Sequence, residues 1–199
     1  MAALQFNARI MAPAADVDAL AAWLDGLDPA TRKAETLSLI PKAQRRLWAL
    51  AAGRAVTLEQ LVPPGTPPEH MIRHFGRNTL PKPIHLFEKP MCRPPEGEAP
   101  GVLWGFNEGV TRPLIGPGYF VLRATPGDSR GAAVVDYYQV PSRAPTGWPA
   151  VKPNERGLQR FAFAEMHDFL RRVSEHVVIG RAYKRDRRTN NCFVLCREG

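Results

Sequence analysis

Two histidines four residues apart, His70 and His74, have a spacing that could do chemistry. On a helix, positions i and i+4 share a face, where two imidazoles can bind one metal ion. We expect a helix over 67–75, because Thr66 and Glu69 match a capping box. The pattern HMIRH lacks the glutamate of the HExxH zinc motif, and no third ligand can be assigned. We therefore predict two structural histidines and no metal site.

A second group of polar residues lies in the C-terminal half. His167 and Arg171 are four residues apart, and a guanidinium can bind a carboxylate or phosphate with two parallel hydrogen bonds. Asp136 follows two valines in a predicted strand, and alternation places it with Val134 and Tyr138. If that face is the core, Asp136 needs an arginine or histidine partner; the alternative is that it is solvated. A ligand-binding site is predicted at Asp136, Tyr138, His167 and Arg171, and the alternative for His167 and Arg171 is a solvated face.

The basic residues favour a different class of partner. The chain carries 27 Lys and Arg against 19 Asp and Glu, a net charge of +8, and a local excess of +5 lies between Arg156 and Arg188. A basic hairpin can bind a polyanion such as nucleic acid through phosphate contacts. The residues predicted for that role are Arg181, Lys184, Arg185, Arg187 and Arg188. No zinc finger or RNA-recognition signature accompanies them.

Signatures of nucleophilic catalysis and phosphate binding are absent from the sequence. No serine sits in a GxSxG elbow, and LIGPGY at 114–119 has neither phosphate-loop spacing. Cys192 and Cys196 are about 13 Å apart if they lie on one strand, which is beyond disulfide reach. Three cysteines in a chain of this size fit a reducing compartment. The sequence indicates no cofactor and leaves open whether a reaction is catalysed.

The first third of the chain is expected to be helical and to position these residues from one side. Asp16 can cap a helix whose apolar positions run from Val17 to Leu27. Asp28-Pro29 predicts the start of a second helix, and further helices are expected over 42–52 and 57–62. Residues 1–76 are therefore predicted to form a cluster of short helices.

The remainder, 77–199, is predicted to be an antiparallel sheet of about five to six strands. An irregular edge segment at 79–93 precedes strands at 102–107, 119–125 and 132–140, and a last hairpin pairs 177–183 with 192–197. A long helix is expected over 155–176, capped by Asn154, because its apolar positions recur at the helical period. The predicted fold class is therefore α+β.

Length and composition fit a single domain over 1–199, with 44% hydrophobic and 23% charged residues. No apolar run is long enough to cross a bilayer and no secretory signal is recognised, so we expect a cytoplasmic protein without membrane contact. The function expected is binding of a small, anionic or partly apolar molecule between the sheet and the long helix. Nucleic-acid or polyanion binding is the alternative, and nothing in the sequence indicates an oligomeric state.

Overall fold

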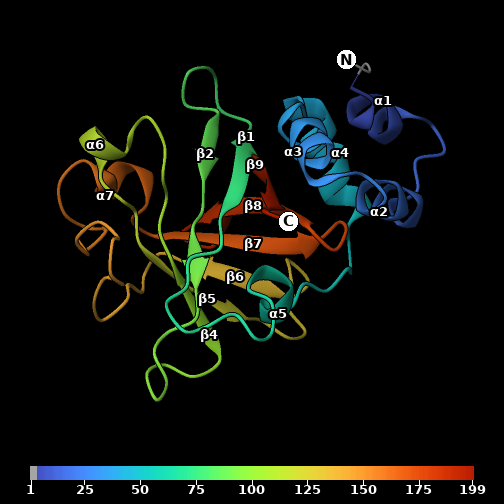
Figure 1. Ribbon diagram of the computed structural model, residues 1–199. Coiled ribbons are helices and arrows are strands. Elements are labelled where there is room, and N and C mark those ends of the chain that lie inside the picture. The colour runs from blue at the N-terminus through green and yellow to red at the C-terminus, as the bar shows by residue number, and fades with distance from the viewer. Residues whose placement is uncertain (1–3) are drawn as a thin grey trace.

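The computed structural model describes residues 4–199, which form seven short helices and one curled antiparallel sheet of nine strands (Figure 1). The strands lie in the order β2-β1-β9-β8-β7-β6-β5-β4-β3. Their bounds are β1 His74–Asn78, β2 Leu86–Glu88, β3 Met91–Cys92, β4 Val102–Gly105, β5 Phe120–Ala124, β6 Ala133–Asp136, β7 Met166–Arg172, β8 Val177–Lys184 and β9 Arg187–Arg197.

The two edge strands of this sheet are neighbours in the chain. β2 pairs with β1 at one end of the sheet and β3 pairs with β4 at the other, yet only Lys89 and Pro90 separate them. Lone bridges of Ile72 with Met91 and of Glu88 with Glu108 add contacts where the edges meet. Pro90 has no backbone donor, which suits a position where strand pairing is interrupted. The curl of the sheet therefore brings its two ends together at Lys89.

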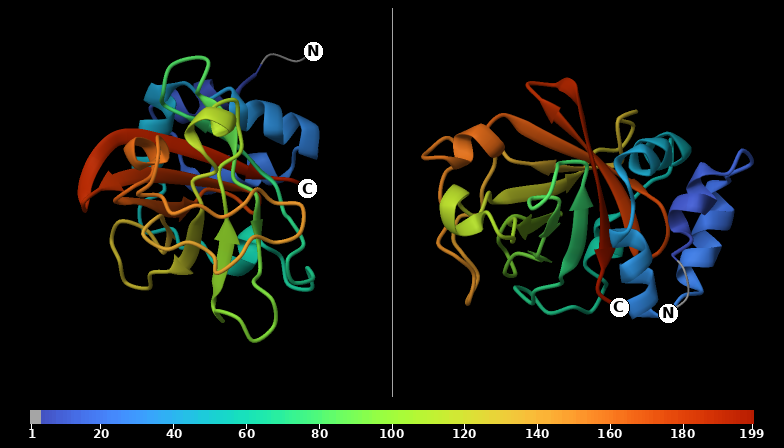
Figure 2. Two further views of the ribbon diagram at one scale, coloured as in Figure 1. Left: turned by 90° about the vertical axis from the view of Figure 1, so that its left-hand side faces the viewer. Right: turned by 90° about the horizontal axis from the view of Figure 1, so that it is seen from above.

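Four N-terminal helices cover the outer face of the sheet, on the side opposite α6 and α7 (Figure 2). Of these helices, α3 and α4 pack on β1, β8 and β9, and α1 packs on α4, in a core that includes Leu47, Ile179 and Val194. The helices of the chain are α1 Phe6–Met11, α2 Val17–Asp25, α3 Pro29–Leu37, α4 Pro41–Leu50, α5 Leu58–Leu61, α6 Arg112–Ile115 and α7 Gln159–Ala162. No described helix is long and apolar enough to cross a membrane.

A second core fills the inner face of the sheet. It gathers side chains of β5, β6, β7 and β9, among them Phe120, Val135, Leu170 and Phe193. Because both faces of β6 and β7 are covered, adjacent residues such as Phe169 and Leu170 are both buried in opposite cores. The sheet therefore separates two hydrophobic cores.

The predicted α+β arrangement is wrong, because the long helix over 155–176 does not form. Only Gln159–Ala162 is helical there, and Met166–Arg172 is strand β7 between β6 and β8. A strand buried on both faces has apolar residues on both sides, and its pattern here resembled a helical stripe. Asn154, the expected helix cap, is buried, and its side-chain amide donates to the carbonyls of Tyr119 and Tyr137.

Other local predictions are confirmed in part. The Asp16 side chain accepts from the Ala19 amide at 2.9 Å, and the Asp28 side chain caps the helix that begins at Pro29. The strands at 102–107, 119–125 and 132–140 form the antiparallel run β4-β5-β6. The helix over 67–75 is wrong, because His74 lies in β1, so His70 and His74 share no helical face.

Candidate ligand site

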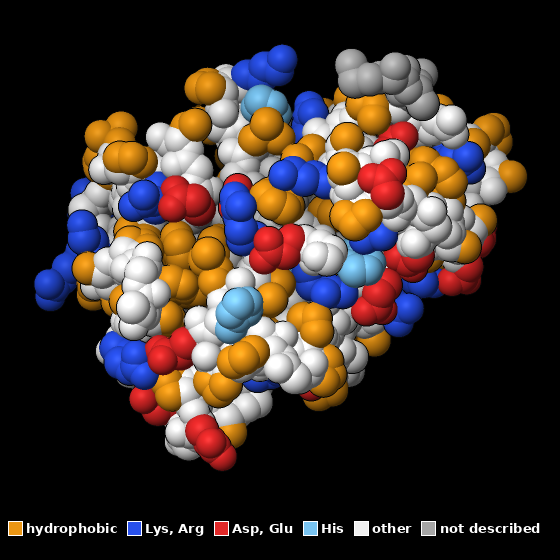
Figure 3. All heavy atoms as spheres, in the orientation of Figure 1, with side chains coloured by type: hydrophobic (Ala, Val, Ile, Leu, Met, Phe, Trp, Pro, Cys, Tyr) orange, Lys and Arg blue, Asp and Glu red, His pale blue; other side chains and the backbone are white. Residues whose placement is uncertain are grey.

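A cavity of about 430 Å³ opens on the inner face of the sheet, beside β2 and the segments that carry α6 and α7. Its lining is mostly apolar, with polar residues that include Glu108, Arg112 and Lys184. In the space-filling view, hydrophobic side chains gather between β2 and α7 (Figure 3). Five large apolar residues line the cavity and remain 37 to 70% exposed: Leu80, Ile84, Leu86, Val110 and Phe161.

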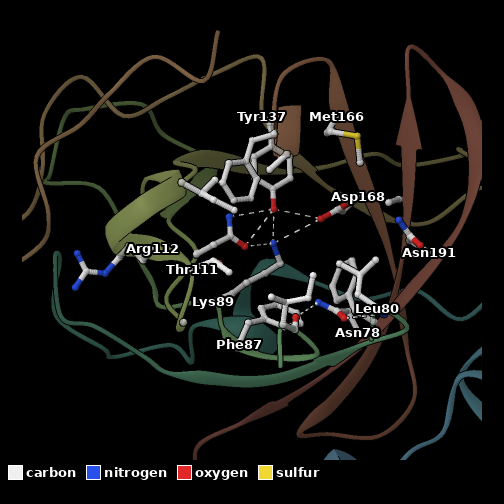
Figure 4. A pocket seen from close by; sticks show the side chains of 18 of the residues that line it. Asn78, Leu80, Phe87, Lys89, Thr111, Arg112, Tyr137, Met166, Asp168 and Asn191 are labelled. Carbon is white, nitrogen blue, oxygen red and sulfur yellow. Dashed lines mark hydrogen bonds and ion pairs between the residues drawn. The ribbon is translucent and has the colours of Figure 1, made fainter. Parts of the chain in front are cut away.

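Lys89 lies at the floor of the cavity, because it occupies the link between the two edges of the sheet (Figure 4). Its backbone amide donates to the carbonyl of His74 at 2.9 Å, and its carbonyl lies 3.1 Å from the His74 ring. Only 2% of the Lys89 side chain is exposed. The two edges therefore hold one amine inside the curl of the sheet.

Three polar side chains surround the Lys89 amine, and we call these four residues the inner polar cluster. The Lys89 Nζ donates to Asn107 Oδ1 at 2.8 Å and to the Tyr137 hydroxyl, and it lies 3.5 Å from Asp168 Oδ2. The Tyr137 hydroxyl lies 3.3 Å from the same Asp168 oxygen. The Asn107 amide also donates to the carbonyl of Gly118, which fixes its orientation. The cluster joins four segments of the chain at one point.

Four aromatic rings lie near the amine. The Nζ of Lys89 lies 4.9 to 5.7 Å from the ring centroids of Phe120, Tyr137, Phe193 and Phe87. Rings at this distance exclude water and attract a cation through their faces.

The three phenylalanines among these rings each lie opposite a glycine on the neighbouring strand. The pairs in register are Phe87 with Gly76, Phe120 with Gly105 and Phe193 with Gly180. A Cβ atom at these glycines would approach the rings to 2.6, 2.3 and 2.1 Å respectively. Only the absence of a side chain therefore lets each ring lie across its neighbouring strand.

Burial sets the protonation of the inner polar cluster. Loss of solvation lowers the pKa of Lys89 to about 8, although the Asp168 charge opposes this shift. Burial also raises the pKa of Asp168 above its usual value, against the opposing effects of Lys89 and Tyr137. The pKa of Tyr137 is raised well above 10 by burial and by the Asp168 charge. Both ends of the Lys89–Asp168 pair are thus shifted towards their neutral forms.

Three of the predicted ligand-binding residues, Asp136, Tyr138 and His167, meet on the opposite face of the sheet. Arg123 joins them, and we call these four residues the outer polar cluster. His167 Nε2 lies 3.3 Å from Asp136 Oδ1, and the Arg123 Nε lies 3.4 Å from Asp136 Oδ2. The Tyr138 ring packs on His167 at 4.8 Å between centroids. Asp136 is 3% exposed and has the histidine and arginine partners expected for a buried carboxylate.

The Asp136 carboxylate differs from Asp168 in its titration. Burial raises its pKa, but the hydrogen bonds from His167 and the Tyr138 amide and the charge of Arg123 outweigh burial, and the net pKa is lowered. Asp136 is therefore a stably ionised group.

Arg171, the fourth predicted ligand-binding residue, does not join this cluster. Its guanidinium donates to the backbone carbonyls of Trp48, Ser129 and Arg130 at 2.8 to 3.0 Å and stacks on the Trp48 ring. These contacts join β7 to α4 and to the loop at 125–131, so all the hydrogen bonds of the Arg171 guanidinium that the structure shows go to the protein's own backbone.

The five residues predicted for polyanion binding occupy different environments. Arg181 is buried, and its Nε donates to the carbonyl of Thr189. Lys184 lines the inner cavity, and Arg185 pairs with Glu165 at 2.7 Å. Arg187 and Arg188 are exposed at the start of β9. Of the five predicted residues, only Arg187 and Arg188 are both exposed and outside the inner cavity and the Glu165 ion pair.

Metal binding has no support in the residues described. Within 4–199 no three His, Cys, Asp or Glu side chains are grouped so that they could hold an ion. His74 is 1% exposed, and burial lowers its pKa to about 4, so it is a neutral core residue.

Sequence reasoning missed Lys89, Asn107 and Asp168. Lys89 lies in the segment predicted to be an irregular edge, and Asp168 lies within the predicted long helix over 155–176. One signal was available: β1 and β8 carry an interior glycine and β4 ends at one, and glycine in a strand often marks the close approach of another group.

Comparison of the chain with protein-family models, with curated proteins and with solved structures found no match.

Proposed function

We propose that the protein binds a small, largely apolar molecule in the inner cavity, with an oxygen of that molecule directed at Lys89. The observation that carries the proposal is a buried polar floor at Lys89 in a cavity whose lining is mostly apolar, with polar residues such as Glu108, Arg112 and Lys184 on its walls. Ligand sites of this kind have volumes of roughly 300–1,000 Å³ and a few polar groups that fix orientation.

The chemistry of the floor favours an acceptor oxygen on the ligand. The protonated Lys89 amine has donors and no acceptor, and the longest of its three polar contacts, 3.5 Å to Asp168 Oδ2, is the one that a ligand oxygen can replace. A ligand carrying an ammonium would add a second cation beside Lys89, in a place where water is excluded. An alcohol, carbonyl or carboxylate is therefore preferred over an amine of equal length.

Calorimetric titration with octan-1-ol tests the proposal. Transfer of the alkyl chain at about 0.8 kcal/mol per CH₂ predicts a dissociation constant on the order of 0.1 mM. Octylamine should bind at least ten-fold more weakly. No saturable heat with octan-1-ol, or equal binding of octylamine, would contradict the proposal.

Two matched variants test whether octan-1-ol binds in the inner cavity. Ala162 is exposed and lines the cavity, so a ring introduced by Ala162→Trp obstructs the mouth without disturbing the core. Ala52 is exposed just past α4, on the other side of the sheet, and Ala52→Trp is the control. We expect Ala162→Trp to weaken octan-1-ol binding at least ten-fold and Ala52→Trp to leave it unchanged.

A further inference from the structure

Lys89 differs from every other lysine of the chain in its surroundings. The other five, Lys33, Lys42, Lys82, Lys152 and Lys184, are exposed or half-buried. Lys89 alone is buried, with its amine at the floor of a cavity open to small molecules. An amine in this position can meet a ligand in the absence of bulk water.

Burial keeps part of the Lys89 population uncharged, against the opposing effect of the Asp168 charge. An amine must lose its proton before it can attack a carbon atom, and burial lowers the pKa of Lys89 from 10.5 to about 8. At pH 7 its neutral fraction therefore exceeds that of an ordinary lysine by on the order of 100-fold. The raised pKa of Asp168 makes this carboxylate a suitable acceptor for the displaced proton.

We propose that Lys89 forms an imine with an aldehyde or ketone bound in the inner cavity. This inference rests on the proposed function, since it names the substrate class of the same site. It is argued from the placement of Nζ at the cavity floor, within 3.5 Å of a carboxylate and in hydrogen-bond contact with a phenol.

The reaction balances with groups that the site contains. The lone pair of the neutral Nζ forms a bond to the carbonyl carbon as the π pair of the C=O bond moves to oxygen. Asp168 then accepts the extra proton of the nitrogen and supplies a proton to the oxygen, which gives a carbinolamine. The carbinolamine then loses its hydroxyl group as water, with the proton supplied by the Asp168 carboxyl, and the nitrogen proton returns to Asp168. The net change is amine plus carbonyl to imine plus water, with no oxidant or reductant.

Asp168 is also positioned to exchange protons with the oxygen of the ligand. Its Oδ2 lies between Nζ of Lys89 and the Tyr137 hydroxyl, at 3.5 and 3.3 Å. Asn107 holds the other side of Nζ through Oδ1. A carbonyl compound with an apolar body would thus have its chain against the apolar walls and its reactive carbon next to the amine.

Octanal with sodium cyanoborohydride at pH 7 is the test, because reduction converts the imine into a stable octyl-lysine that peptide mass spectrometry locates. We expect Lys89 to be alkylated on the order of ten-fold faster than the exposed Lys42, or more. Excess octan-1-ol, which occupies the same cavity without reacting, should slow alkylation of Lys89 and leave Lys42 unchanged. This competition does not depend on a variant that folds.

The outcomes separate the two proposals. If octan-1-ol binds to the wild type but Lys89 is alkylated no faster than Lys42, imine formation is wrong and the ligand site stands. If octan-1-ol does not bind and Lys89 shows no preference, both proposals are wrong. Lys89→Met should abolish the preferential label while the labelling rate of Lys42 is unchanged.

Discussion

The inner and outer polar clusters are built from adjacent residues of the same two strand segments, yet their carboxylates behave in opposite ways. Asp136 and Tyr137 are neighbours in sequence, as are His167 and Asp168, and in each pair one residue points to each face of the sheet. On the outer face Asp136 has its pKa lowered by His167 and Arg123, whereas on the inner face burial dominates and raises the pKa of Asp168. The partner of Asp168 is an amine that burial also shifts towards neutrality.

The difference shows how solvent access determines what a charge pair can do. Arg123 is 41% exposed, so the outer cluster keeps its counter-charges in contact with water. The inner pair has 2% and 8% of its side chains exposed, and burial penalises both charges. We interpret the outer cluster as a structural ion pair and the inner cluster as the reactive one.

The largest expected effect comes from removing one partner of the inner pair. Lys89→Met leaves Asp168 buried without its cation and should lower the free energy of unfolding by about 3–5 kcal/mol at pH 7. Urea denaturation measures this. The double variant Lys89→Met/Asp168→Leu, which removes both charges, should recover most of the loss. A double variant as unstable as the single one would contradict the pairing.

A pH series separates the clusters further. The unfolded chain keeps the Lys89 proton up to about pH 10.5, whereas the folded chain loses it near pH 8. Between these values the unfolded state binds more protons, so the contribution of Lys89 to stability rises with pH, by up to about 3 kcal/mol. The measured quantity is the difference in unfolding free energy between wild type and Lys89→Met from pH 7 to 10.5. A difference that is flat with pH would refute the lowered pKa.

Substitution of Gly180, the glycine opposite Phe193, tests whether the aromatic rings around Lys89 need a glycine on the neighbouring strand. Gly180→Ala places a Cβ atom against the ring and should force Phe193 towards the cavity, lowering the free energy of unfolding by about 2 kcal/mol. Octan-1-ol should bind more weakly to this variant. Gly26→Ala is the control, since a Cβ there meets only ordinary contacts at 3.5 Å. Equal effects of the two substitutions would show that Phe193 does not need the glycine.

The smallest effect is expected at the outer cluster. His167→Gln keeps a hydrogen-bond donor for Asp136, and Arg123 remains as counter-charge, so stability at pH 7 should fall by about 1 kcal/mol or less. Octan-1-ol binding and octanal labelling of Lys89 should be unchanged. Loss of octan-1-ol binding or of Lys89 labelling in this variant would show that the outer polar cluster takes part in ligand binding or in the reaction.

Local sequence signals predicted the elements whose ends are capped by their own residues. The helices after Asp16 and Asp28 were found because side-chain caps act over a few positions, and the hairpin of β5 and β6 because its loop carries turn residues. Strand β7 was missed because Phe169 and Leu170 are buried on opposite faces, and two-sided burial removes the alternation that marks a strand.

The inner cluster could not be predicted, because no local signal shows that the two edges of a sheet meet. Lys89 acquires its role only when β2 and β3 pair with opposite ends of the sheet. Asp136, by contrast, was selected from strand alternation alone, and the partners expected for a buried carboxylate are present. Pairing across one strand is predictable from sequence, whereas closure of a whole sheet is not.

The most direct test of the ligand site uses methyl-labelled methionine in solution NMR during titration with octan-1-ol. Met166 lines the inner cavity, whereas Met11 packs against the outer core and Met71 lies on the surface. We predict a saturable shift of the Met166 methyl signal with those of Met11 and Met71 unchanged. An unchanged Met166 signal, or equal shifts at Met71, would contradict binding in the inner cavity.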